Sequence, residues 1–179
     1  GGNTTRMTLS TRVETENLKA QLYGQYYDFN LFSNFTYFLD DPVRGDEFEQ
    51  VDNRSVFGGN ISYQNDVAIS EMDLVWTVGG EFRYDNITEV GLYKTEDRIR
   101  HTSIRDDSVD EIALGTFIDF KLFVNEKFRI SSGARIDRYS YSVNAARIEN
   151  SGTGNDVALS PKFSTAYRLH ERAEIYANY

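Results

Sequence analysis

The chain has 179 residues, a mass of 20.6 kDa, a formal net charge of −9 and no cysteine. The absence of cysteine excludes disulfide frameworks and thiolate metal sites, and the negative charge argues against binding to the phosphate backbone of nucleic acids. Mean hydropathy is −0.53 and no run of 18 apolar residues exists, so no transmembrane helix is predicted, although the strands of a membrane barrel would escape this test.

The first two predicted strands lie before residue 39. Residues 6–14 alternate strictly, with Met7, Leu9 and Val13 on one face, which indicates a half-buried strand. Residues 18–38 form an unusually long second segment, and its apolar parity changes near Tyr26 and Tyr27. This change of phase predicts a β-bulge. A turn near residues 28–30 that divides the segment into two strands is the alternative.

Six further segments show the same two-residue period and are predicted as strands. Residues 110–124 give the clearest pattern, with Ile112, Leu114 and Ile118 opposite Ala113 and Asp119. No segment keeps a 3.6-residue period, so no helix is predicted. The expected fold class is all-β, an antiparallel up-and-down meander of about eight strands. The six segments cover residues 55–64, 72–85, 110–124, 128–143, 157–169 and 173–179.

The connections between these strands alternate in length. Short turns are predicted near residues 15–17, 64–70, 125–127 and 170–172, and long connections at residues 39–54, 94–107 and 147–156. A meander threaded through a membrane has tight turns on one side and long polar loops on the other. The pattern therefore predicts strands of a transmembrane β-barrel, as part of a larger barrel.

The second face of the predicted strands carries small and oppositely charged residues. Arg83 with Asp85, and Arg135 with Asp137, point the same way two residues apart. These four are interpreted as lumen-facing charges, because a hydrated lumen keeps charges solvated or paired. Surface ion pairs on a soluble sheet are the alternative. Aromatic residues near strand ends are interpreted as a membrane-interface girdle: Tyr63, Trp76, Tyr84, Tyr139, Tyr141, Tyr167 and Tyr176.

Two stretches of the chain resemble the barrel domain of TonB-dependent outer-membrane receptors. The first is LFSNFTYFLDDP at residues 31–42, followed by DEFEQ at residues 46–50; the second is LSPKF at residues 159–163, followed by EIYANY at residues 174–179. Receptors of this kind close about 22 strands around a plug. Because no plug domain, energy-coupling box or signal peptide is recognised, residues 1–179 are expected to form a middle portion of such a barrel.

The resemblance implies an outer-membrane protein of a Gram-negative bacterium that imports a scarce nutrient such as a ferric siderophore. Its expected partners are outer-membrane lipid, a small-molecule or metal-chelate ligand, and the TonB energy-coupling system, reached through parts outside this chain. No catalysis, cofactor or resident metal is expected. The long extracellular loops would meet the ligand, and arginine suits an anionic chelate because its fork holds carboxylates. The candidate contacts are Arg44, Asp46, Phe48, Arg98, His101, Arg105 and Arg147.

Two further features could be metal sites or ordinary surface residues. The histidines, His101 and His170, are far apart in sequence, and both are interpreted as loop or turn residues rather than metal ligands. An acidic stretch from Asp40 to Asp52 offers oxygen ligands for Ca²⁺, but it lacks the spacing of an EF-hand. A solvated surface loop is therefore the preferred interpretation.

Two other architectures remain open from the sequence. One is a self-contained eight-stranded outer-membrane barrel with an adhesive or structural role, which requires the first and last strands to pair. The other is a soluble β-sandwich binding module, which the low hydrophobicity favours. The strand lengths argue against the sandwich, because they exceed those usual in soluble sheets.

Overall fold

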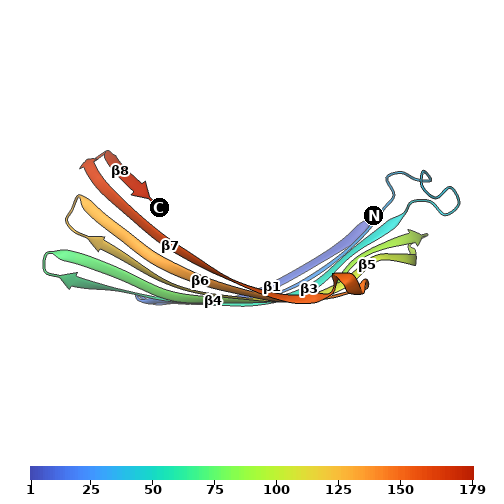
Figure 1. Cartoon of the computed structure of the whole chain (residues 1–179), viewed down its shortest axis with the longest axis horizontal. Helices are drawn as coiled ribbons and strands as arrows, with labels where there is room; N and C mark the ends of the chain where they lie inside the picture. The colour runs from blue at the N-terminus through green and yellow to red at the C-terminus, as the bar shows by residue number, and fades with distance from the viewer.

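The computed structural model describes residues 1–179 as one antiparallel sheet of eight strands, in which the strands lie in chain order (Figure 1). The predicted all-β meander is confirmed. The only helical element is the 3₁₀ turn η1 (Ile148–Asn150), and no helix is long and apolar enough to cross a membrane. The strands are β1 (Gly2–Glu14), β2 (Leu18–Ser33), β3 (Phe48–Ile69), β4 (Met72–Glu96), β5 (Ile99–Phe123), β6 (Phe128–Ala145), β7 (Gly152–His170) and β8 (Ala173–Asn178).

The sheet is a single curved layer (Figure 1), and only 14 of 179 residues are buried. A β-sandwich would bury one face of each sheet against the other, so the sandwich interpretation is wrong. Strands β1 and β8 form the two edges and do not pair with each other. The eight strands therefore do not close into a small barrel, and the interpretation as a self-contained eight-stranded barrel is also wrong.

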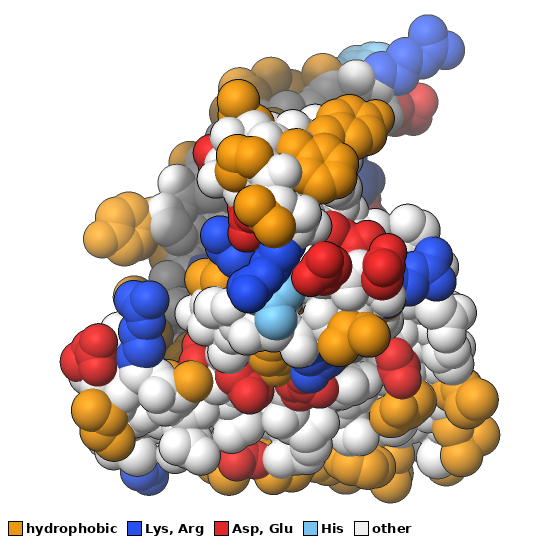
Figure 2. Space-filling model, turned by 90° about the vertical axis from the view of Figure 1, so that its right-hand side faces the viewer, with side chains coloured by type: hydrophobic (Ala, Val, Ile, Leu, Met, Phe, Trp, Pro, Cys, Tyr) orange, Lys and Arg blue, Asp and Glu red, His pale blue; other side chains and the backbone are white.

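The register sorts the side chains onto two chemically distinct faces, because neighbours across an antiparallel sheet share a face. The apolar face runs continuously from β1 to β7, and many of its large hydrophobic side chains are more than a third exposed. Hydrophobic side chains line the bottom of the view in Figure 2, which is the convex side of the curved sheet in Figure 1. The residues that follow one another across this face include Leu9, Leu22, Phe57, Phe82, Leu114, Ile136 and Leu159.

The connections separate to the two ends of the sheet (Figure 1). The short turns gather at one end, as predicted, and include Asn17 and the pair Ser70 and Glu71. The turn predicted at residues 64–70 is reduced to this pair, because β3 continues to Ile69. At the other end the predicted long loops are shorter, because β3, β4, β5 and β7 continue into them. The strand predicted at residues 18–38 ends earlier, at Ser33, so residues 34–38 belong to a loop. Residues 94–107 are strand almost throughout and reverse at Asp97 and Arg98, both with positive φ. The other two connections are residues 34–47, called the β2–β3 loop, and residues 146–151.

Strand β2 pairs with both neighbours without a register shift, so the predicted bulge near Tyr26 and Tyr27 is wrong, as is the alternative turn. The strand stays regular while the chemistry of its two faces changes. Tyr26 is followed on its own face by Asp28 and Asn30, whereas Phe29 and Leu31 lie on the opposite face. The register irregularities occur elsewhere. They lie between Asn53 and Arg54 of β3, at three places between β4 and β5, and between Arg168 and His170 of β7.

The aromatic residues near strand ends divide between the two faces. Tyr63, Trp76, Tyr84 and Tyr167 lie on the apolar face, where Tyr63 and Trp76 pack with ring centroids 5.6 Å apart. Tyr139, Tyr141 and Tyr176 lie on the polar face. The predicted girdle is therefore wrong for these last three residues, because the parity of each strand, and not the distance from its end, decides which face a side chain covers.

Candidate functional site

The polar face carries a repeated motif in which an arginine and an acid two residues apart on one strand form an ion pair. Arg83 donates to Asp85 at 2.6 and 2.7 Å, and Arg135 donates to Asp137 at 2.8 Å. Side chains at i and i+2 lie on the same side of a strand, so each pair is set by a single strand. The same motif recurs on this face at Arg12 with Glu14, Arg54 with Asp52, and Arg105 with Asp107.

Two further ion pairs on the polar face cross an entire strand, and a glycine makes each crossing possible. Arg135 of β6 reaches Glu81 of β4 at 2.9 Å, above Gly115 of β5. A Cβ at Gly115 would lie 2.5 Å from the Arg135 Nη2 atom. Lys162 of β7 reaches Asp119 of β5 at 2.7 Å, above Gly133 of β6. The charges thus lie flat against the sheet and bind one another.

Aromatic rings cover other glycines of the polar face in the same way. The Tyr23 ring lies over Gly58 and the Phe117 ring lies over Gly79. A strand glycine leaves room for a neighbouring side chain to approach the backbone closely. A hollow of about 490 Å³ remains between the covered positions, and its walls include Glu81, Arg83 and Asp137.

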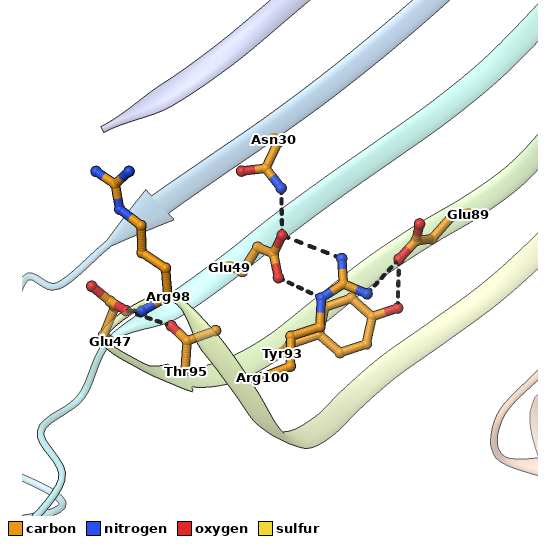
Figure 3. Close-up of polar contacts among 8 residues, drawn as sticks. All are labelled: Asn30, Glu47, Glu49, Glu89, Tyr93, Thr95, Arg98 and Arg100. Carbon is orange, nitrogen blue, oxygen red and sulfur yellow. Dashed lines mark hydrogen bonds and ion pairs between the residues drawn. The ribbon is translucent and has the colours of Figure 1, made fainter.

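A second polar cluster lies at the end of the sheet opposite the short turns, on the same side as the apolar face (Figure 3). Arg100 donates to Glu49 at 2.5 Å and to Glu89 at 3.0 Å, and its guanidinium lies 3.8 Å from the centroid of the Tyr93 ring. Asn30 also donates to Glu49, and the Tyr93 hydroxyl donates to Glu89 at 2.8 Å. The Glu49 side chain is only 5% exposed, so this network satisfies a buried carboxylate.

The β2–β3 loop is tied to the tip of the β4–β5 hairpin through Glu47 (Figure 3). One carboxylate oxygen of Glu47 accepts from the Thr95 hydroxyl at 2.8 Å and from the Arg98 backbone N–H at 2.9 Å. The Thr95 N–H also donates to the Glu47 carbonyl at 2.9 Å. Two segments far apart in sequence are therefore fixed relative to each other at this end of the sheet.

Asp46 organises the β2–β3 loop from within. Its carboxylate accepts from the Thr36 hydroxyl at 2.7 Å and from the backbone N–H groups of Leu39, Asp40 and Asp41 at 2.8 to 3.2 Å. The Thr36 hydroxyl and these N–H groups lower the pKa of Asp46 to about 2. Asp46 therefore shapes the loop, and its carboxylate is engaged with the protein.

The acidic stretch does not assemble a cation site. Asp41 accepts from the N–H groups of Val43 and Arg44 at 3.0 and 2.9 Å, which lowers the pKa of its carboxyl. Glu47 and Glu49 are engaged as described above. No group of three or more His, Asp or Glu side chains is placed to hold a metal ion.

The predicted ligand contacts lie at one end of the sheet. They differ in whether their side chains are already bound to other protein groups. Arg44 is exposed in the β2–β3 loop, and Phe48 packs on Phe35 with centroids 6.0 Å apart. Arg98 lies at the hairpin tip with its guanidinium 5.4 Å from the Phe32 ring centroid. Arg105 is paired with Asp107 at 2.5 Å, so its charge is already matched.

His101 and Arg147 complete the set. The Nδ1 atom of His101 lies 3.0 Å from the Thr102 hydroxyl on an exposed bulge of β5. Arg147 is exposed in the connection between β6 and β7, where the N–H of Ala146 donates to the Asp106 carbonyl at 3.0 Å. Glu47 joins the segments that hold Arg44, Asp46, Phe48 and Arg98, whereas Arg147 belongs to a separate connection.

Sequence reasoning missed the cluster of Glu49, Glu89, Tyr93 and Arg100. Its members belong to three strands, and Glu49 and Arg100 are separated by 51 positions in the chain. Only the register of β3, β4 and β5 brings these residues together. That register cannot be read from the sequence, because it shifts at three places between β4 and β5.

The TonB-dependent receptor-like β-barrel family model matches residues 1–179. Among solved structures, the ferric citrate transporter FecA is 16% identical with a TM-score of 0.69, and the copper transporter OprC is 20% identical with a TM-score of 0.69; each alignment covers 99% of this chain. The ferric yersiniabactin receptor FyuA of Yersinia pestis is 17% identical, with a TM-score of 0.54 over 98% of this chain. This chain spans 27% to 29% of those three proteins. No curated protein sequence matches it.

Proposed function

Since this chain belongs to the TonB-dependent receptor-like β-barrel family, we propose that it forms part of the barrel wall of an outer-membrane receptor of a Gram-negative bacterium, which imports a scarce nutrient such as a ferric siderophore. The proposal rests on the chemical difference between the two faces of the sheet. One face presents large hydrophobic side chains to its surroundings across seven strands, while the other holds charges that neutralise one another. Lipid suits the first face and a hydrated lumen suits the second.

The strand lengths support the same orientation. A transmembrane strand needs about 9–11 residues, whereas β3, β4 and β5 have 22, 25 and 25 residues. The excess lies at the end opposite the short turns, where Asp28, Asn30 and Glu49 replace hydrophobic residues on the apolar side of the sheet. That end projects from the membrane into the extracellular space, and Arg83, Asp85, Arg135 and Asp137 face the lumen.

The ligand is met at the projecting end. Arg44, Arg98 and Arg147 have exposed guanidinium groups there, and each is held on a different connection between strands. Asp46, Phe48, His101 and Arg105 support or flank these segments. The chemistry suits a metal chelate, consistent with the iron and copper named for the similar receptors. Energy for passage comes from the TonB system, through parts of the receptor outside this chain.

Uptake by the full-length receptor tests this proposal. Cells with and without the receptor gene are supplied with radiolabelled ferric citrate, a ferric catecholate or a copper chelate. We expect saturable uptake of at least one of them, abolished by a protonophore and by loss of TonB. If cells with the receptor take up none of these chelates faster than the deletion strain, the proposed import function is contradicted.

Ligand affinity of the purified receptor tests the proposed contacts. A triple variant, Arg44→Ala, Arg98→Ala and Arg147→Ala, is compared with Arg172→Ala, which changes an exposed arginine at the short-turn end. We expect at least a ten-fold rise in Kd for the triple variant and no change for the control. Equal affinities would place the ligand elsewhere while leaving the uptake result intact.

A further inference from the structure

One arginine lies among the hydrophobic side chains of the apolar face. Arg138 of β6 is directly opposite Leu114 of β5 and Val157 of β7, and Ile136 precedes it on the same face. These three aliphatic side chains are between 48% and 60% exposed, and Arg138 is also exposed. The other arginines of the strands lie on the polar face, with the exception of Arg100, so Arg138 alone brings a positive charge to this hydrophobic surface.

The position of Arg138 along β6 coincides with the expected surface of the bilayer. β6 begins at Phe128 beside a short turn, so Arg138 is the eleventh residue of the strand. A transmembrane strand needs about 9–11 residues. The first charged residue on the apolar side of β2, Asp28, is likewise the eleventh residue of its strand. An arginine at this depth rests its aliphatic stem on hydrophobic neighbours and extends its guanidinium to the level of the lipid headgroups.

The protein itself supplies no partner for this charge. None of the ion pairs in the sheet includes Arg138. The nearest carboxylate on the same face, Asp110, is opposite Ser142, four residues further along β6, which is on the order of 13 Å at about 3.3 Å per residue. Asp110 already accepts from the Tyr84 hydroxyl at 2.6 Å and from the Asn86 amide at 2.8 Å. Ionised side chains at membrane depth normally have a partner, and the bilayer is what remains to supply it.

A lipid phosphate has the charge, the depth and the geometry that Arg138 requires. The planar fork of a guanidinium donates two parallel hydrogen bonds to phosphate oxygens. A phosphate that belongs to a lipid also brings acyl chains, which run down the barrel wall in van der Waals contact with Leu114, Ile136 and Val157. A soluble phosphate has no acyl chains and contacts the guanidinium alone. The combination of one unpaired arginine with aliphatic neighbours therefore favours a lipid over a free anion.

From these observations we infer that Arg138 binds the phosphate group of a lipid in the outer leaflet, with the acyl chains of that lipid against Leu114, Ile136 and Val157. The inference rests on the proposed function, which places the apolar face in the outer membrane. The site lies on the outer wall of the barrel, on the face opposite the lumen. It is therefore separate from the connections that are proposed to meet the cargo, and its ligand is a component of the membrane.

The test measures lipid binding beside Arg138 in the full-length receptor, purified in dodecyl maltoside, a detergent without phosphate. Leu159→Trp supplies a fluorescent reporter, because Leu159 is opposite Ile136 on the same face and is 66% exposed. Phosphatidic acid and diacylglycerol with the same spin-labelled acyl chains are titrated separately, and the quenching is corrected with receptor that lacks the reporter. The two lipids differ only in the phosphate group. We expect phosphatidic acid to bind at least five-fold more tightly than diacylglycerol.

Matched variants assign the preference to the guanidinium. Arg138→Gln should remove the preference for phosphatidic acid, whereas Arg138→Lys, which keeps the positive charge, should retain a measurable preference. Arg172→Gln makes the same change of net charge in an exposed turn at the short-turn end of the sheet, and it should leave the preference unchanged. Excess inorganic phosphate should not displace the lipid, because it makes no contact with the aliphatic side chains.

Four results would overturn the inference. One is equal quenching by the two lipids. Another is a preference that survives Arg138→Gln, or that Arg172→Gln also removes. The third is displacement of phosphatidic acid by inorganic phosphate, which would assign the guanidinium to a soluble anion. These three leave the proposed import function intact. The fourth, quenching by neither lipid, would contradict the placement of the apolar face in the membrane as well, so the two failures are distinguishable.

Discussion

The guanidinium of Arg135 binds the carboxylate of Glu81 at 2.9 Å across the full width of β5. The contact exists because Gly115 lies between them, with no side chain of its own. Asp137 holds the same guanidinium from its own strand at 2.8 Å. One glycine thus lets three charges on two non-adjacent strands form a single flat cluster.

Gly115→Ala should abolish the coupling between Glu81 and Arg135. An added Cβ would lie 2.5 Å from Arg135 Nη2 and 2.7 Å from Asp137 Oδ1, so the arginine must move away. Both partners are more than a third exposed, and such pairs contribute about 0.2–1 kcal/mol. A double-mutant cycle with Glu81→Gln and Arg135→Gln measures this coupling from urea unfolding in detergent or lipid. A coupling that persists in Gly115→Ala would show that the glycine is not required.

Gly79 and Gly80 should respond oppositely to alanine. At Gly79 a Cβ would lie 2.4 Å from the Phe117 ring and 2.9 Å from the Ile61 carbonyl, whereas at Gly80 the nearest atom is 3.6 Å away. We expect Gly79→Ala to destabilise the barrel by about 1–3 kcal/mol, as overpacking does, and Gly80→Ala to be neutral or slightly stabilising. Unfolding midpoints of the two variants provide the comparison. Equal midpoints would contradict the close approach of Phe117.

Arg100→Met should loosen the β4–β5 hairpin. The change leaves the Glu49 carboxylate, 5% exposed, with Asn30 as its remaining side-chain donor, and a buried charged group that loses its partner costs roughly 1–3 kcal/mol or more. Hydrogen exchange of the β4–β5 hairpin should accelerate at least ten-fold, with exchange at the short-turn end of the sheet unaffected. Arg172→Met, at the opposite end, is the control and should not change exchange.

Features that depend on neighbouring residues in the sequence could be predicted, whereas features that depend on pairing between strands could not. Alternation and turns are local, so the eight strands, their order and the pairs Arg83–Asp85 and Arg135–Asp137 could be predicted. The regular course of β2 could not, because a change of polarity between its faces resembles a bulge in sequence. Glu49 and Arg100 meet through a register set by bulges in the β4–β5 hairpin, which no local pattern reveals.

The order of the β2–β3 loop should depend on pH through Asp46. The pKa of Asp46 is lowered to about 2 in the folded loop from an ordinary 3.8. The folded loop therefore stabilises the ionised carboxylate. The stabilisation is fully present above the ordinary pKa and is lost as pH falls from about 4 towards 2. A dye on Val43→Cys should report this as falling fluorescence anisotropy, and the chain has no native cysteine to compete.

Asp46→Asn separates this effect from general acid unfolding. It should lower the anisotropy at every pH and speed tryptic cleavage after Arg44 at least ten-fold. Asp40→Asn is the control, because Asp40 contributes only its backbone N–H to the loop. An Asp46→Asn receptor that keeps the anisotropy and protease resistance of the unmodified receptor would refute the role of the carboxylate.

Leu159 and Ala158 offer the sharpest test of which face meets the lipid. They are consecutive residues of β7, both exposed, and they lie on opposite faces of the sheet. Arginine at a lipid-facing position costs about 2–4 kcal/mol at the midplane of the bilayer and less near its surfaces, whereas the lumen tolerates charge. Leu159→Arg should therefore reduce the unfolding free energy and the amount of heat-modifiable receptor in the outer membrane, and Ala158→Arg should change neither. The reverse order would exchange the two faces, and equal effects would argue that this part of β7 does not lie in the bilayer.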